Sequence, residues 1–150
     1  PGLEFELHPS EADALYPTGI WRPAGAAGDV TVVTYGGMTE IVEAAMAAAF
    51  AEDEVVAELV VPAQLAPLRL DAILHSVRRT GRLVVVEEGT GPWGFGAELV
   101  AAVSEAMAGA PLRCARVAAH PLPIPGARPA EDAVLPDAAR VVAAIRQVMR

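Results

Sequence analysis

The sequence has one cysteine, no long apolar run and few basic residues. One cysteine, Cys114, excludes a disulfide within the chain and makes a reducing cytoplasm the expected compartment. No apolar run approaches the roughly 18–20 residues of a membrane span, and no signal peptide is recognisable. Lys and Arg together number only 11 and form no basic stripe, which disfavours nucleic acid because phosphate neutralisation needs clustered cations. We therefore expect a cytoplasmic protein that binds neither a membrane nor a nucleic acid.

Charge and length add further expectations. Nineteen acidic residues bring the net charge to −8, and an acidic surface suits a basic partner. Charged residues reach only 20%, which is low for a lone soluble monomer, so we expect a partner to cover part of the surface. The 150 residues suffice for one domain, and a first residue of Pro1 rather than Met fits a piece of a longer chain.

Apolar strands and amphipathic helices alternate along most of the chain. β-branched runs predict strands, and apolar residues at helical spacing predict helices. The expected strands are 3–7, 19–24, 30–34, 55–61, 82–87 and 112–118, and the expected helices are 39–51, 70–79, 97–108 and 137–149. The proline-rich stretch 120–136 is expected to be irregular. Apolar strands separated by helices predict a three-layer α/β/α domain around a mostly parallel sheet.

A glycine-rich loop follows the strand at 82–87. Residues 89–94, Gly-Thr-Gly-Pro-Trp-Gly, match G-x-G-x-x-G, a motif whose backbone approaches a pyrophosphate. The match does not follow the first strand, and about 20 residues further on stand Arg113 and Cys114 instead of an acid. Pro92 also removes a backbone donor. We therefore interpret the loop as a structural turn that brings the next helix close to the sheet.

Two carboxylates, Glu87 and Glu88, end the same strand at its carboxyl edge, where open α/β sheets bind ligands. Neighbouring side chains on a strand point to opposite faces, so the pair cannot act as a catalytic dyad there. We expect one of them to hydrogen-bond toward a helix and the other to lie at an interface.

Other chemically active residues form no catalytic group. The three histidines, His8, His75 and His120, are widely separated, and none has metal-ligand spacing to another histidine or to Cys114. Cys114 is expected in the core of its strand, and Ser76 on the polar side of helix 70–79. Trp93 and Phe95 lie in the glycine-rich loop, where exposed aromatics often anchor an interface. Folding back onto the core is an equally good expectation for both.

A family resemblance starts at Asp29-Val-Thr-Val-Val-Thr-Tyr-Gly36 and continues through Thr80-Gly-Arg82 into the strand at 82–87. These residues resemble the transketolase C-terminal domain family. Gly94-Phe-Gly-Ala-Glu98, together with Pro121-Leu-Pro123 and the later Glu131, resembles the branch formed by β subunits (E1 component) of thiamine-diphosphate-dependent 2-oxoacid dehydrogenases.

The resemblance implies a mixed five-stranded sheet with an antiparallel first strand near 19–24. Residues 29–150 would form the transketolase C-terminal-like domain, and 1–28 the exit of a preceding domain, a linker and the edge strand. Thiamine diphosphate and Mg²⁺ would be held by other domains, so this chain alone would bind no cofactor and contain no catalytic residue. Its partners would be an α-type subunit or thiamine-diphosphate-binding domain, a second β copy and the acyltransferase core.

The resulting hypothesis is an assembly domain whose interface gathers at the strand ends. The expected interface residues are Glu88, Trp93, Gly94, Phe95, Gly96, Glu98, His120 and Glu131. Two alternatives stay open: the C-terminal domain of a transketolase or deoxyxylulose-phosphate-synthase-like enzyme, and a nucleotide- or metabolite-binding regulatory module. The sequence does not determine which 2-oxo acid a complete enzyme would use.

Overall fold

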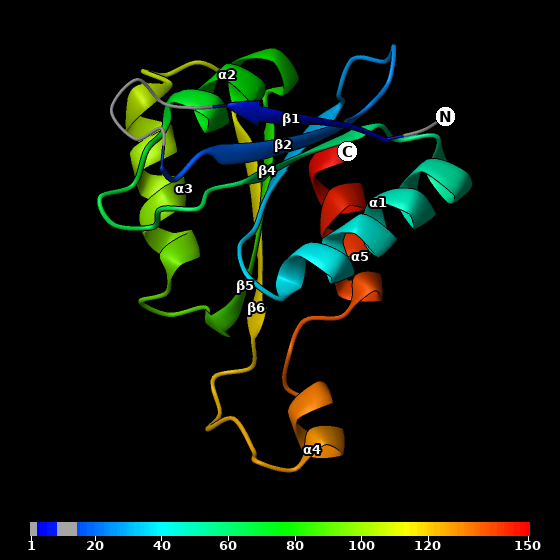
Figure 1. Ribbon diagram of the computed structural model, residues 1–150, viewed down its shortest axis with the longest axis vertical. Helices are drawn as coiled ribbons and strands as arrows, with labels where there is room; N and C mark the ends of the chain where they lie inside the picture. Colours follow the sequence, from blue (N-terminus) through cyan, green and yellow to red (C-terminus); the bar gives the residue numbers. More distant parts are fainter. Residues whose placement is uncertain (1–2, 9–14) are drawn as a thin grey trace.

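The computed structural model describes residues 3–8 and 15–150. Within them a single mixed sheet is covered by helices on both faces (Figure 1). The strands are β1 (Leu3–His8), β2 (Thr18–Pro23), β3 (Val30–Val33), β4 (Ala57–Val61), β5 (Arg82–Thr90) and β6 (Arg113–Ala119). The helices are α1 (Met38–Asp53), α2 (Asp71–Thr80), α3 (Phe95–Ala106), α4 (Arg128–Asp132) and α5 (Ala138–Met149).

The strand order in the sheet is β1-β2-β4-β3-β5-β6. β2 runs antiparallel to β4, whereas β4, β3, β5 and β6 are mutually parallel. The mixed, mostly parallel sheet expected from the sequence is therefore confirmed, including the antiparallel strand near residues 19–24. β1 pairs antiparallel with β2 and adds a sixth strand at that edge of the sheet.

Two apolar clusters, one on each face of the sheet, make this a three-layer domain. α1 and α5 pack together on one face over side chains such as Val32, Val84 and Val117. α2 and α3 cover the other face over Val33 and Val85, so alternate residues of each strand serve opposite cores. All four residues of β3 are buried, as its unbroken β-branched run predicts.

Two local expectations prove wrong. The stretch 120–136 is not wholly irregular, because it contains the short helix α4; Pro129 stands in the first turn of α4, where its missing N–H costs nothing. Ser76 is fully buried rather than on the polar side of α2. Its hydroxyl lies 2.7 Å from that of Thr31 on β3, and Thr31 also lies 2.9 Å from the hydroxyl of Thr80.

The chain diverges at the carboxyl ends of two neighbouring strands. β3 leads into α1 on one face, whereas the adjacent β5 leads into α3 on the other face (Figure 1). Such a divergence is the place where open α/β sheets usually offer a binding site. Among the described residues, no helix has the length and apolar character needed to cross a membrane.

Candidate interface site at the carboxyl edge of the sheet

Glu87 is the buried centre of this edge. Its side chain is only 1% exposed, and its Oε1 accepts a hydrogen bond of 3.0 Å from the backbone N–H of Gly96 in the first turn of α3. The N-cap residue of α3, Gly94, provides no side-chain cap. The carboxylate of a strand residue therefore caps the helix, and its negative charge lies at the positive end of the helix dipole. The expectation of one helix-facing, hydrogen-bonding glutamate is confirmed for Glu87.

The carboxylate of Glu87 explains why glycine stands at positions 94 and 96. A Cβ at Gly94 would lie 2.6 and 2.8 Å from the two carboxylate oxygens of Glu87 and 2.4 Å from the carbonyl oxygen of Thr90. A Cβ at Gly96 would lie 2.7 Å from Oε1 of Glu87. No real Cβ sits so close to an oxygen. The interpretation as a structural turn is therefore confirmed, and an acidic group already occupies the position that a phosphate would take at the start of α3.

Tyr35 and Phe95 close the edge above Glu87. Their rings meet edge to face, with centroids 5.1 Å apart and an interplanar angle of 79°, a favoured aromatic geometry. Burial raises the pKa of the Tyr35 hydroxyl, and the nearby negative charges of Glu87 and then Glu88 raise it further. Tyr35 therefore acts as a neutral, packed side chain at neutral pH.

Trp93 and Phe95, for which the sequence supported the same expectation, differ in burial. Phe95 packs against the core beside α3, whereas the side chain of Trp93 is 100% exposed. Trp93 has a positive φ of 61°, a left-handed conformation that bulky residues rarely adopt. The loop before it is fixed by Arg116 of β6, which donates a 2.9 Å hydrogen bond to the carbonyl oxygen of Gly91. The result is an aromatic side chain presented to solvent from a braced turn.

Two exposed acidic residues flank this turn in the sequence. Glu88 is exposed at the end of β5, and its oxygens lie about 4 Å from where Cβ atoms of Gly36 and Gly37 would stand. Glu98 is exposed in the first turn of α3. Both carboxylates are therefore available to a basic partner.

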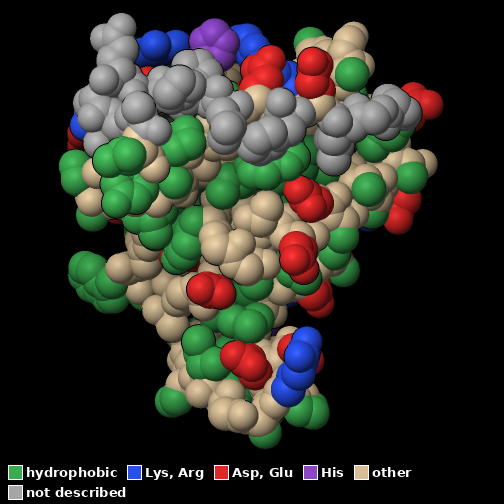
Figure 2. Space-filling view, viewed as in Figure 1, with side chains coloured by type: hydrophobic (Ala, Val, Ile, Leu, Met, Phe, Trp, Pro, Cys, Tyr) green, Lys and Arg blue, Asp and Glu red, His purple; other side chains and the backbone are tan. Residues whose placement is uncertain are grey.

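A protruding arm, residues 120–136, extends beyond the same edge (Figure 1). Its base is closed by the N–H of His120 bonding to the carbonyl oxygen of Val134, and α4 buries none of its residues. His120 is exposed and Glu131 half-buried, while Leu122 and Ile124 are 58% and 50% exposed. Figure 2 shows hydrophobic side chains together with charged ones at this end of the molecule. The arm thus offers apolar surface that the body of the domain does not use.

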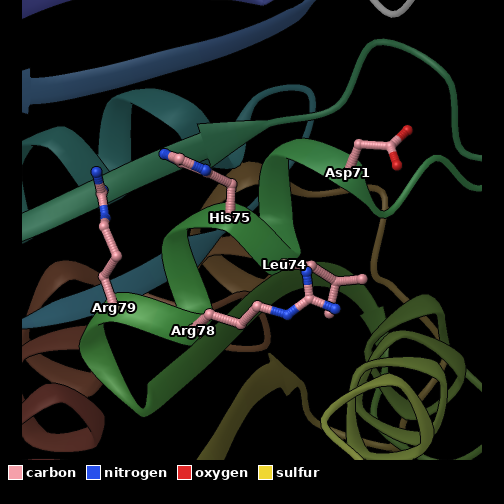
Figure 3. Close-up of a pocket in the computed structure, with 5 residues that line it drawn as sticks. All are labelled: Asp71, Leu74, His75, Arg78 and Arg79. Carbon is pink, nitrogen blue, oxygen red and sulfur yellow. The ribbon is translucent and has the colours of Figure 1, made fainter.

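The described residues offer neither a metal site nor an activated thiol. No three His, Cys, Asp or Glu side chains among them are placed to hold a metal ion. Burial raises the pKa of the half-buried Cys114 thiol, which disfavours the thiolate of a nucleophile. A cavity of about 450 Å³ lies against α2. Its side chains fan out in different directions, with Arg78 turned away from His75 and Arg79 (Figure 3).

The eight residues expected at an interface all lie at one end of the domain. Six belong to the end of β5, the loop and the start of α3, and two belong to the arm that follows β6, whose carboxyl end lies beside that of β5. Sequence reasoning missed Tyr35, Leu122 and Ile124. The position of Tyr35 directly after β3 could have suggested its place at this edge.

The sequence of this chain matches a known protein family. Residues 21–141 match the family described as "Transketolase, C-terminal domain". The chain belongs to this family.

Its curated relatives include β subunits of oxidoreductases. It is 36% identical to the acetoin:2,6-dichlorophenolindophenol oxidoreductase subunit beta of Cupriavidus necator over 99% of this chain and 44% of that protein. It is 40% identical to the 2-oxoisovalerate dehydrogenase subunit beta of Pseudomonas aeruginosa over 87% of this chain and 35% of that protein. The chain thus spans less than half the length of these relatives.

A solved structure shares the fold. The chain aligns with a split-gene transketolase, described as an inactive beta4 tetramer, with a TM-score of 0.68 and 27% identity. The alignment covers 82% of this chain and 40% of that one.

Proposed function

We propose that this chain is the C-terminal assembly domain of the β part of a thiamine-diphosphate-dependent 2-oxoacid dehydrogenase. Such an enzyme decarboxylates a 2-oxo acid oxidatively and transfers the acyl group to a lipoyl arm. The observation that carries the proposal is the braced, fully exposed Trp93 beside the acidic carboxyl edge, in a domain related to dehydrogenase β subunits. Aromatic anchors on rigid supports are typical of interface hot spots.

The role proposed for the edge is subunit contact. An α-type subunit or thiamine-diphosphate-binding domain and a second β copy would cover Trp93 and the arm. Exposed Glu88 and Glu98, on a chain of net charge −8, suit a basic segment of the acyltransferase core. The single cysteine agrees with a reducing compartment such as the cytoplasm.

Thiamine diphosphate does not fit the glycine loop of this chain. A diphosphate at the start of α3 would meet the carboxylate of Glu87, which already accepts the Gly96 N–H. The cofactor and its Mg²⁺ are therefore proposed to lie in the other domains of the full enzyme. The same contact argues against a regulatory module that binds nucleotide phosphates in this loop.

The second candidate is a transketolase- or deoxyxylulose-phosphate-synthase-like enzyme, favoured by the similarity to the split-gene transketolase. The test is an assay of the full-length protein with its thiamine-diphosphate-binding partner. We expect turnover of a 2-oxo acid with an artificial electron acceptor and none of sugar phosphates; the reverse result would establish the second candidate. Because the curated relatives differ in substrate, branched 2-oxo acids, pyruvate and acetoin should all be included.

We expect this chain without its partner to be inactive, since the split-gene transketolase is described as inactive in its beta4 form. Turnover by the separate chain, supplied with thiamine diphosphate and Mg²⁺, would contradict the assembly role.

A further inference from the structure

Four arginines lie at the amino edge of the sheet, opposite the site described above. The chain contains no lysine, so all eleven basic residues are arginines. Arg78 and Arg79 lie in the last turn of α2, and Arg82 and Arg113 begin β5 and β6. Four of the eleven arginines of an acidic chain therefore lie where α2 ends and two strands begin.

Arg82 and Arg113 stand side by side. They are partners in the parallel register of β5 and β6, so both side chains leave the sheet on the same face. Like charges on directly neighbouring strand positions repel each other. The pair is therefore an unfavourable arrangement unless a negative charge accompanies it.

The protein supplies little of that negative charge. Arg79 is neutralised by the buried Glu58, which lies on the α2 face. Arg82 donates to the backbone carbonyl oxygens of Asp29, at 3.1 Å, and Thr80, at 3.4 Å, both neutral acceptors. The Asp29 carboxylate itself accepts the Val56 N–H.

Arg82 and Arg113 keep hydrogen-bond donors that have no acceptor among the described residues. Nε of Arg82 is buried and has no acceptor among the described residues. Arg113 is exposed, and no described carboxylate forms an ion pair with it. Buried charged donors without acceptors are costly, and guanidinium groups favour oxyanions because they can bind them in a bidentate manner.

A cavity of about 220 Å³ is lined by both arginines together with Thr80, Gly81 and Pro111, with no acid in the lining. We propose that this cavity binds a small, doubly charged oxyanion, either free phosphate or the phosphate group of a monoester. The strand register places the two arginines next to each other, so both can contact one ligand. Their guanidinium donors favour a ligand with negative charge. This proposal does not depend on the function proposed above.

The test is a titration of the full-length protein with inorganic phosphate, and separately with phenyl phosphate, followed by calorimetry and by the melting temperature. Sodium chloride at equal ionic strength measures general screening. We expect saturable binding and a rise in melting temperature that chloride does not reproduce. Binding of both ligands indicates a monoester site, and binding of inorganic phosphate alone indicates the free ion.

The variants Arg113→Gln and Arg128→Gln form a matched pair of exposed arginines at opposite ends of the domain. Arg113→Gln should weaken phosphate binding about tenfold, whereas Arg128→Gln should leave it unchanged. Arg113→Lys, which retains the charge without the planar fork, should fall between the two. Equal phosphate binding by the native protein and Arg113→Gln, or equal stabilisation by chloride, would overturn the proposal.

Discussion

The carboxylate of Glu87 lies against the backbone of Gly96, joined by a 3.0 Å hydrogen bond between strand β5 and the start of α3. This contact joins the end of β5 to the far side of the glycine-rich loop that carries the exposed Trp93. It anchors the start of α3, which begins two residues after Trp93, to the end of β5.

Removal of this carboxylate should destabilise the domain. Glu87→Ala deletes the cap of α3 and leaves the buried Gly96 N–H unpaired, at a cost of about 2 kcal/mol in the free energy of unfolding. Glu87→Gln retains an acceptor oxygen and should cost less. Urea denaturation measures both, and a Glu87→Ala variant as stable as the native protein would refute the capping role.

Because of the same carboxylate, substitution of Gly94 or Gly96 should destabilise the domain. Gly94→Ala and Gly96→Ala should each cost about 1–3 kcal/mol of unfolding free energy, because the added Cβ overlaps the oxygens of Glu87. Gly126→Ala serves as the control, since a Cβ there meets nothing within 4 Å. In a double-mutant cycle, Gly96→Ala should cost less in the Glu87→Ala background. Strictly additive costs would show that the carboxylate is not the cause of the overlap.

The buried hydroxyl pair beneath α2 should contribute to stability. Ser76→Ala leaves the hydroxyl of Thr31 without one of its two hydroxyl neighbours and should lower the free energy of unfolding by about 1 kcal/mol. Ser104→Ala, at an exposed position on α3, should change stability by less than about 0.5 kcal/mol. Thermal unfolding of the two variants provides the comparison, and equal melting temperatures would count against the hydroxyl pair.

Stability should fall at high pH through Tyr35. Its pKa in the folded state is raised by burial and then by Glu87 and Glu88, so the fold favours the neutral phenol. That contribution is complete below the unfolded pKa of about 10 and is lost as the pH rises through the folded pKa. Tyr35→Phe should therefore lose less stability than the native side chain between about pH 9.5 and 11.5. Both proteins should carry Cys114→Ser, because burial raises the pKa of that thiol as well. Parallel curves for the two proteins would contradict the shift.

The sequence was sufficient to predict the layered fold, because apolar alternation and β-branched runs are local signals. It also predicted that Glu87 and Glu88 point apart, since strand geometry requires it. The burial of Ser76 depends on Thr31, which is 45 residues away. Which glutamate faces inward depends on the contact of Glu87 with the Gly96 N–H, which the strand pattern alone does not reveal. The different fates of Trp93 and Phe95 follow from one left-handed residue in the turn, which no periodicity reveals.

The most direct test of the assembly role replaces Trp93 by Asn, which tolerates the left-handed backbone while removing the indole. The control is Leu15→Ala, an exposed apolar residue beside β2, toward the other edge of the sheet. Mass photometry of the full-length protein mixed with the proposed thiamine-diphosphate-binding partner measures the association constant. We predict that Trp93→Asn keeps the native melting temperature but associates at least about tenfold more weakly, a loss of about 1.4 kcal/mol, while Leu15→Ala associates normally. Native association of Trp93→Asn would contradict the central claim that the carboxyl edge is the subunit interface.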